Sequence, residues 1–292
     1  MYAVIGITGQ VGGAVARKLL AHKRRVRAVL RDANRGLPWA VRGCEMARAD
    51  LHDAASLTAA FKGVEGVFAM LPPIFDPSPG FPEARALIAS LRSALAAASP
   101  PKVVCLSTVG AQAKQQNLLT QLTILEKELG ELPLPVTFLR PAWFMDNFAW
   151  DIAPARTTGV VSSFLQPLDR HFPMVATEDV GRVVAELLQD DRTGRRIVEL
   201  EGPRRIAPVE VARTLSEVLN RAVRADAVPR DKWEALFTSQ GMKHPKPRIE
   251  MLDGFNEGWI DFEGGEAHTV KGRIELKAVL ETLSVNGAGV AA

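Results

Sequence analysis

Tyrosine, cysteine and histidine are scarce in this sequence of 292 residues. It contains one tyrosine, Tyr2, together with two cysteines and five histidines. Cys44 and Cys105 fall in separate strand-like segments, so we expect two buried free thiols and no disulfide. The histidines are scattered without the spacing of metal ligands, and we therefore expect no metal site.

Long hydrophobic runs and a strong charge excess are also missing. No segment approaches the roughly 18 consecutive apolar residues that a membrane-spanning helix needs, and Met1 leads directly into a strand-like segment without a signal sequence. Lys and Arg total 36 against 33 Asp and Glu, which gives a net charge of +3. We expect no nucleic-acid or membrane partner. With 47% hydrophobic residues, the chain is predicted to be a soluble, cytoplasmic, globular protein.

Three glycines spaced three residues apart are the most informative feature that is present. Gly6, Gly9 and Gly12 follow an apolar strand-like segment and lead into residues with helical periodicity. Gly6 permits a sharp turn, Gly9 lets the backbone approach a pyrophosphate, and Gly12 lets the helix sit close to the strand. The helix N-terminus then faces the phosphates. We predict a dinucleotide-binding turn that contacts the cofactor through Gly6, Thr8, Gly9, Gln10, Val11 and Gly12.

Strand-like and helical segments alternate along the first half of the chain. After the first strand and helix, the apolar patterns predict strands over 26–30, 45–49, 67–71, 103–106 and 136–139. They predict helices near 53–61, over 82–98 and over 118–129. This alternation indicates an α/β fold built on a parallel, doubly wound sheet with right-handed crossovers. Ligands bind such sheets at the carboxyl ends of the strands.

The rest of the chain is less regular. Residues 142–172 look irregular, and further elements are expected over 177–188, 196–200, 208–219 and 231–239. We predict a nucleotide-binding domain over 1–200, with 142–172 contributing to the substrate side. Residues 201–292 are predicted to form a smaller, α-rich C-terminal substrate lobe that ends in a disordered tail over 286–292.

The end of the second strand indicates which dinucleotide binds. Arg31 stands where an NAD-specific protein would place an acidic residue for the ribose, and its planar guanidinium suits a 2′-phosphate, with Arg35 as a second contact. Asp32 follows at once and leaves an NAD-type acid as the alternative. We predict NADP(H). Further cofactor contacts are expected from residues that follow other strands, namely Asp50, Leu51, Leu71, Pro72, Ser107 and Pro141. Asp50 has a second interpretation, as a cap of the next helix.

The loop over 72–82 carries five prolines and is not expected to form regular structure. We interpret it as a semi-rigid lid beside the cofactor. The alternative is a surface loop with no role in binding.

Four features together resemble the atypical short-chain dehydrogenase/reductases, and in particular their NmrA-like branch. They are the glycine turn, Arg31, the segment Ser107-Thr108-Val109-Gly110-Ala111 after the fifth strand, and Arg140-Pro141 after the sixth. The resemblance covers residues 1–200 well and the remainder loosely. It implies a Rossmann domain with a small substrate lobe that binds NAD(P). Different members act as quinone reductases, as aromatic ether reductases or as redox-sensing regulators.

The scarcity of tyrosine then becomes informative, because classical members of that superfamily use a Tyr-x-x-x-Lys pair. There the lysine lowers the pKa of the tyrosine, whose phenol exchanges a proton with the substrate. In the matching register this chain has Thr123 and Lys127, and Tyr2 precedes the first strand. Threonine is too weak an acid to replace tyrosine. Alcohol dehydrogenation, sugar epimerisation and dehydration are therefore disfavoured.

Quinone reduction depends least on a strong proton donor. A quinone that accepts a hydride becomes an aromatic hydroquinone anion, which can take its proton from water, so positioning contributes most of the catalysis. Lys127 is a candidate for stabilising the developing charge and contacting the cofactor, and Ser107 or Thr108 for donating a hydrogen bond. The alternatives are a solvated helix residue for Lys127 and a hydroxyl that satisfies the backbone for Ser107.

The substrate pocket is predicted from aromatic and polar residues on the substrate side, namely Trp143, Phe144, Asn147 and Phe255. Their aromatic rings suit stacking on a planar substrate, and core packing is the alternative for them. The favoured function is an NADPH-dependent reductase of quinones or similar conjugated carbonyls. The alternatives are an NADP(H)-binding redox sensor that acts on a protein partner without turnover, and an ether or imine reductase that uses Lys127 as proton donor. A homodimer is compatible with each.

Overall fold

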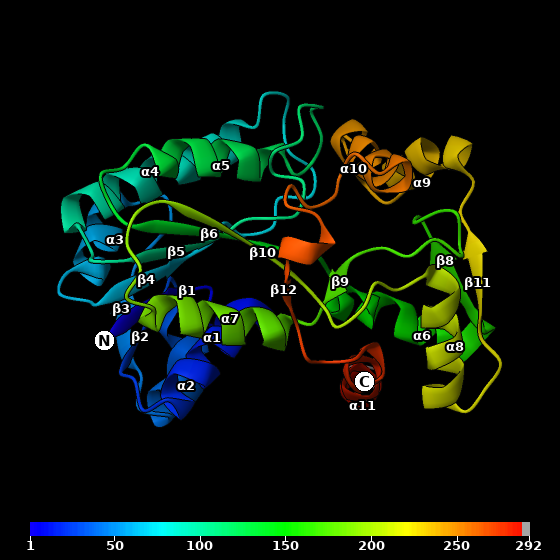
Figure 1. Ribbon diagram of the computed structural model, residues 1–292, viewed down its shortest axis with the longest axis horizontal. Coiled ribbons are helices and arrows are strands. Elements are labelled where there is room, and N and C mark those ends of the chain that lie inside the picture. Colours follow the sequence, from blue (N-terminus) through cyan, green and yellow to red (C-terminus); the bar gives the residue numbers. More distant parts are fainter. Residues whose placement is uncertain (288–292) are drawn as a thin grey trace.

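The computed structural model describes residues 1–287, and its centre is an eight-stranded, fully parallel sheet (Figure 1). The strands are β1 (Tyr2–Ile5), β2 (Val26–Leu30), β3 (Glu45–Arg48), β4 (Gly66–Ala69), β5 (Val103–Leu106), β6 (Val136–Pro141), β10 (Arg196–Glu201) and β12 (Val270–Lys271). Their spatial order is β12-β10-β6-β5-β4-β1-β2-β3. The order reverses between β1 and β4, which is where a doubly wound sheet opens a crevice for a ligand.

Helices cover both faces of this sheet. On one face lie α3 (Ala54–Phe61), α4 (Pro82–Ala98) and α5 (Thr120–Gly130), and on the other lie α1 (Gln10–Ala21) and α7 (Thr177–Gln189) (Figure 1). A short 3-10 turn, η1 (Ala33–Gly36), and α2 (Leu37–Val41) follow β2. Helices α1 and α7 approach closely because residue 181 of α7 is glycine. A Cβ at Gly181 would lie 2.5 Å from the Cβ of Ala14 on α1. The α/β prediction is confirmed.

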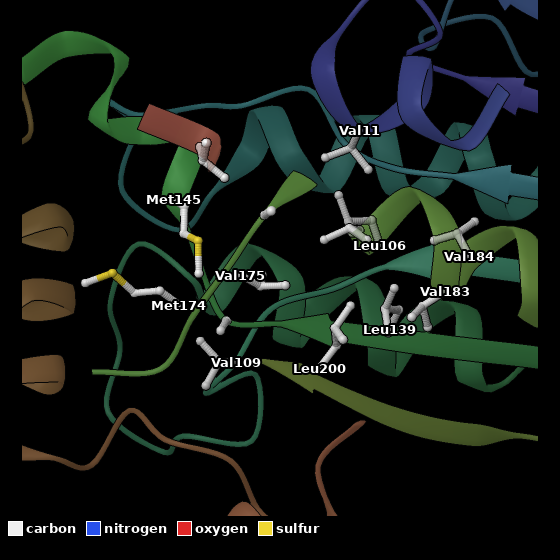
Figure 2. Close-up of a cluster of buried hydrophobic side chains, with 14 of the residues drawn as sticks. Val11, Leu106, Val109, Leu139, Met145, Met174, Val175, Val183, Val184 and Leu200 are labelled. Carbon is white, nitrogen blue, oxygen red and sulfur yellow. The ribbon is translucent and has the colours of Figure 1, made fainter. Parts of the chain in front are cut away.

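The strand residues divide between two hydrophobic cores with the period of two that a pleated strand imposes. Val103 and Cys105 of β5 face α3, α4 and α5, whereas Val104 and Leu106 face the α1 and α7 side. The core on the α1 and α7 side extends past the sheet into the C-terminal part of the chain. Figure 2 shows how Val11 of α1, Leu106 of β5 and residues such as Met145 and Met174 belong to one continuous cluster.

The smaller lobe lies beside the carboxyl ends of the strands (Figure 1). It contains η2 (Met145–Asp151), α6 (Ile152–Thr158), β8 (Val160–Ser163), α8 (Pro208–Leu219), β11 (Arg224–Ala227), η3 (Arg230–Lys232), α9 (Trp233–Ser239) and α10 (Lys246–Glu257). Strands β8 and β11 pair in parallel, as do the two-residue strands β7 (Trp143–Phe144) and β9 (Met174–Val175). The described part of the chain ends with η4 (Glu266–His268), β12 and α11 (Leu276–Gly287).

The structure corrects three expectations. The segment 142–172 is not irregular, because β7, η2, α6 and β8 occupy most of it, each too short to show a periodic pattern. Tyr2 is the first residue of β1 and not a residue before it, although it lies at the end of the strand away from the glycine turn. Residues 286–287 belong to α11, whereas 288–292 of the predicted tail lie outside the described residues.

The division of the chain at residue 200 stays a prediction. The structure adds two facts to it. Residues 152–163 lie in the smaller lobe, and β12 returns to the main sheet beside β10.

Candidate active site

The glycine turn has the geometry that its spacing predicts. Gly6 has a φ of +70°, a conformation that favours glycine, and a Cβ there would lie 2.8 Å from the sulfur of Met70. At Gly12 a Cβ would overlap the carbonyl oxygen of Gly6, so only glycine lets α1 start this close to β1. The Gly9 amide donates to the Gly6 carbonyl at 2.9 Å and closes the turn.

The N-terminus of α1 is open toward the carboxyl edge of the sheet, where the strands end. Gly9 caps the helix without a side-chain hydrogen bond, and the first turn contains no acidic residue. Thr8, Gly9 and Gln10 are exposed, while Val11 is buried in the core. The first backbone amides of a helix have no partner within it and attract anions. The arrangement fits a pyrophosphate, because the first turn of α1 has neither a side-chain cap nor an acidic residue.

The end of β2 distinguishes between Arg31 and Asp32. The Asp32 carboxylate accepts a hydrogen bond from the Asn34 amide at 2.9 Å and so caps η1. Arg31 and Arg35 are both exposed, and within residues 1–287 neither takes part in an ion pair. Asp32 is thus engaged locally, whereas the two guanidinium groups are available to a ligand.

Asp50 and Leu51 lie just beyond β3, next to the adenine side that the sequence predicts. The Asp50 carboxylate accepts from the His52 amide at 2.9 Å, and its own amide donates to Ser56 at 3.2 Å. Asp53, not Asp50, caps α3 by accepting from the Ala55 amide at 3.0 Å. Asp50 therefore shapes a turn, and its contact with adenine stays a prediction.

Ser107 belongs to a buried charged network at the ends of β5 and β6. Its hydroxyl donates to the Glu126 carboxylate on α5. Arg140 forms two hydrogen bonds with the same carboxylate, at 2.8 and 2.7 Å, and a third at 2.9 Å with Glu263. Burial opposes the charge of Arg140, but the hydrogen bonds that it donates to Glu126, the negative charge of Glu126 and the hydrogen bond to Glu263 outweigh burial and raise the pKa of the guanidinium.

This network gives Ser107 a partner within the protein. Ser107 and Glu126 are each 5% exposed, and Arg140 is 3% exposed. A hydrogen bond from Ser107 to a substrate would compete with one to a buried carboxylate, which is a strong acceptor. The hydroxyl of Ser107 thus bonds a carboxylate, and not the backbone as the alternative interpretation expected, and its catalytic role stays a prediction. Thr108, the next residue, is half-buried.

Helix α5 does not bring the Tyr-x-x-x-Lys register together as a proton relay. The Thr123 hydroxyl donates to the Ala111 carbonyl at 2.7 Å, and Lys127 is exposed. Glu126 faces the sheet, and the next residue in a helix is turned by about 100°. Among the described residues, Lys127 forms no ion pair. A role for Lys127 toward cofactor or substrate stays a prediction.

The predicted pocket residues after β6 lie at the base of the smaller lobe. Trp143 meets Phe255 of α10 edge to face, with the ring centres 5.4 Å apart. Phe255 is buried, Trp143 and Phe144 are half-buried, and Asn147 is exposed. Pro141 is buried at the end of β6. The structure brings Trp143 and Phe255 together, and leaves Asn147 open to solvent.

The proline-rich loop is attached at two points that the sequence did not reveal. The Gln121 side chain of α5 donates to the Ile74 carbonyl at 3.1 Å. The Asp76 carboxylate accepts from the amides of Lys243 and His244, at 2.8 and 2.7 Å, and the Lys243 amide leads in holding the pKa of Asp76 below its usual range. Leu71, before the loop, is buried, and Pro72 is exposed. The loop thus joins the sheet to the smaller lobe.

Two hollows in the surface lie away from this site. One, of about 340 Å³, lies between β10 and the segment around Gly264, and the other, of about 640 Å³, lies beside β2 and β3. Neither contains a residue of the glycine turn or of the predicted pocket. None of the helices in the described part of the chain has the length and apolar character of a membrane span.

Comparison with known proteins gives the class to which this architecture belongs. The model of the NmrA-like family matches residues 2–257, and the chain belongs to this family of atypical short-chain dehydrogenase/reductases with an NAD(P)-binding Rossmann fold. Among curated proteins, the chain is 26% identical to an NAD(P)H azoreductase of Xenophilus azovorans, over 88% of this chain and 85% of that protein.

Solved structures show the same fold. The triphenylmethane reductase of Citrobacter sp., solved with NADP(H), superposes with a TM-score of 0.76, at 20% identity, over 97% of this chain and 99% of that one. The NADPH-dependent quinone oxidoreductase of Escherichia coli, solved with NADPH, gives a TM-score of 0.73, at 19% identity, over 100% of both chains. These relatives are NAD(P)H-dependent reductases.

Proposed function

We propose that this protein is an NADPH-dependent oxidoreductase that reduces a quinone or a similarly conjugated acceptor. The observation that carries the proposal is the open glycine turn beside Arg31, which forms no ion pair in residues 1–287. The names of its relatives support it, because azo compounds, triphenylmethane dyes and quinones are all conjugated acceptors of a hydride.

The residues of the chain divide the binding of NADP(H) between backbone and side chains. The amides at the start of α1 would hold the pyrophosphate, which Gly9 lets the backbone approach, while Gly6 permits the turn and Gly12 the close start of the helix. Arg31 would bind the 2′-phosphate through its planar guanidinium, with Arg35 beside it. When bound, the nicotinamide supplies a hydride to the acceptor.

The proton that completes the reduction does not need a side chain. Thr123 is bonded to a backbone carbonyl, and Ser107 is bonded to Glu126. A reaction that requires a strong acid at the reacting atom is therefore poorly served. A quinone that accepts a hydride disperses the resulting negative charge over an aromatic ring, so that water suffices as the proton source.

A second candidate function is favoured by the same observation. A protein that senses the ratio of NADP+ to NADPH needs the cofactor site but no proton donor. Such a sensor would bind the oxidised and reduced cofactors with different affinities and would transfer no hydride.

Steady-state oxidation of NADPH by the purified protein, over a panel of benzoquinones, naphthoquinones and azo dyes with NADH alongside, tests the proposal. We expect saturable turnover with NADPH preferred. Tight binding of NADPH with no turnover on any acceptor would overturn the reductase and support the sensor. Equal turnover with NADH would contradict the role of Arg31.

A further inference from the structure

All seventeen phenylalanine and tryptophan residues belong to the described part of the chain. Only two of them are exposed, and those two touch each other. Phe75 is 52% exposed and Trp150 is 71% exposed. They are separated by 75 positions in the sequence, and their rings meet edge to face with the centres 6.3 Å apart and the planes at 70°. Because exposed apolar area costs roughly 25 cal/mol per Å², such a pair is expected to have a use beyond the fold.

The two aromatic residues belong to segments that follow the neighbours of β5, the strand that precedes Ser107. Phe75 belongs to the loop that follows β4, and Trp150 belongs to η2, which follows β6 and β7. In the sheet, β5 lies directly between β4 and β6, and all three run in the same direction. The two rings therefore join the segments that follow the two strands on either side of β5, and one of these strands, β4, is also the neighbour of β1.

This position corresponds to one end of an extended dinucleotide. Arg31 follows β2, so the adenosine end of the cofactor is directed toward β2 and β3. The nicotinamide end is then directed to the opposite side of β1, toward β4 and β5. The end of β4 also touches the glycine turn directly, because the Met70 sulfur packs against Gly6.

Hydrogen bonds of neighbouring residues fix the backbone segments that carry the two rings. Phe75 lies between Ile74, whose carbonyl accepts from Gln121, and Asp76, whose carboxylate accepts two amides of the smaller lobe. On the other side, the Asp146 carboxylate attaches η2 to the start of α7 by accepting from the Thr177 amide and hydroxyl, at 2.9 and 2.7 Å. The backbone is fixed on each side while the rings face solvent, which is the arrangement of a preorganised binding surface.

We propose that Phe75 and Trp150 form an aromatic clamp that binds the outer ring of a planar acceptor with two or more rings. The clamp makes the protein prefer such acceptors to single-ring ones. This inference rests on the proposed function for the identity of the ligand. An edge-to-face contact uses the edge of one ring and one face of the other, so it leaves face area on which a further ring can stack. Each such aromatic contact contributes about 0.5–1.5 kcal/mol beyond simple burial.

Fluorescence provides a test that does not depend on turnover. All five tryptophans lie within residues 1–287, and Trp150 is the only exposed one among them, so acrylamide quenches it before the other four. We expect 1-naphthol, in the presence of NADP+, to protect Trp150 from quenching by acrylamide. Half-maximal protection by phenol should need about a tenfold higher concentration than protection by 1-naphthol. The Trp150→Phe variant should lose the signal. The Phe75→Ala variant should bind 1-naphthol about tenfold more weakly than the wild type.

Turnover gives the matching kinetic readout. We expect Phe75→Ala to raise the KM for a naphthoquinone about tenfold and to leave the KM for benzoquinone unchanged, whereas the control Val209→Ala, an exposed apolar residue on α8, changes neither. Equal protection of Trp150 by naphthol and phenol would overturn the clamp, as would a wild-type dimer that Phe75→Ala converts to a monomer. If no acceptor turns over, the proposed function fails while the protection of Trp150 still decides on the clamp.

Discussion

The ends of β1 and of β5 both face the same crevice, yet they use their residues in opposite ways. After β1, the site is formed by the backbone. Gly6 and Gly12 allow the tight turn and the close start of α1, and the first amides of α1 have no side-chain cap. After β5, the side chains expected to act on a substrate are engaged with the protein itself, because Ser107 donates to Glu126 and Thr123 donates to Ala111. The glycine turn thus keeps the backbone geometry of a binding site. The side chains at the positions of a catalytic register instead form hydrogen bonds within the protein.

The largest effect is expected from breaking the network after β5. Arg140→Met would leave the Glu126 carboxylate buried without its cation, and we expect a loss of about 3–5 kcal/mol in the free energy of unfolding. Urea denaturation measures it. The double variant Arg140→Met with Glu126→Met is the control and should recover part of the loss, because Glu199, 3.7 Å from Arg140, still lacks its cation. A single variant as stable as the wild type would show that the network is not structural.

The glycine turn should be the next most sensitive. Gly12→Ala places a Cβ against the Gly6 carbonyl, which belongs to the backbone and has little room to move, so we expect about 3 kcal/mol of destabilisation and loss of NADPH binding. Thermal unfolding and NADPH titration measure the two effects. The matched control is Gly9→Ala, whose Cβ would lie 3.4 Å from the same oxygen and should leave the fold intact. Equal stability of both variants would contradict the packing argument.

Asp151, at the end of η2, is expected to make the free energy of unfolding depend on pH. Burial raises the pKa of its carboxyl from the ordinary 3.8 to about 6. The folded state therefore holds the proton to a higher pH than the unfolded chain, and stability falls as the pH rises from about 4 to about 6. Above that range, Asp151→Asn should be more stable than the wild type by up to roughly 3 kcal/mol.

Thermal unfolding of both proteins across that range measures the difference. The two curves should converge at the acidic end, where the wild-type carboxyl is protonated in either state. A constant difference across the range would show that Asp151 titrates normally.

Arg31→Ala sharpens the comparison at the cofactor side. We expect the affinity for NADPH to fall about tenfold, because one charge-assisted pair of hydrogen bonds at an exposed position is lost, and the affinity for NADH to stay nearly unchanged. Titration with each cofactor measures this. Asp32→Ala, which removes the η1 cap, is the control and should not alter the preference. Equal weakening of both cofactors would refute a 2′-phosphate contact.

The smallest effect is expected at Lys127. Since its side chain is exposed on α5, Lys127→Met should leave turnover with quinones unchanged. A loss of about a hundredfold or more, the usual contribution of a general acid, would instead support the ether or imine reductase with Lys127 as proton donor.

The sequence was most informative where its pattern is local. Strand β5 and helices α4 and α7 follow the predicted ranges closely, because an apolar period of two or 3.6 residues needs no partner to be visible. Strand β12 could not be predicted, because its two residues, Val270 and Lys271, pair with a strand about seventy positions earlier. The same holds for the lobe residues in 142–172, whose elements are short.

The site shows the same limit. The glycine turn is recognisable from spacing, but the bond between Ser107 and Glu126 joins residues nineteen positions apart. One signal was present: Glu126 shares the buried side of α5 with Leu125 and Leu129, and a carboxylate at a core position requires a partner. Phe75 gave no such signal, since its exposure depends on contacts of the loop with a distant lobe.

A single-turnover experiment tests the central claim most directly: NADPH bound in stoichiometric amount to the protein is mixed rapidly with a naphthoquinone, and its absorbance is followed. We predict complete oxidation of the bound NADPH, at a rate that saturates with the quinone concentration and well above that of free NADPH. Bound NADPH that is oxidised no faster than free NADPH, despite tight binding, would contradict the reductase and leave the cofactor site as that of a sensor.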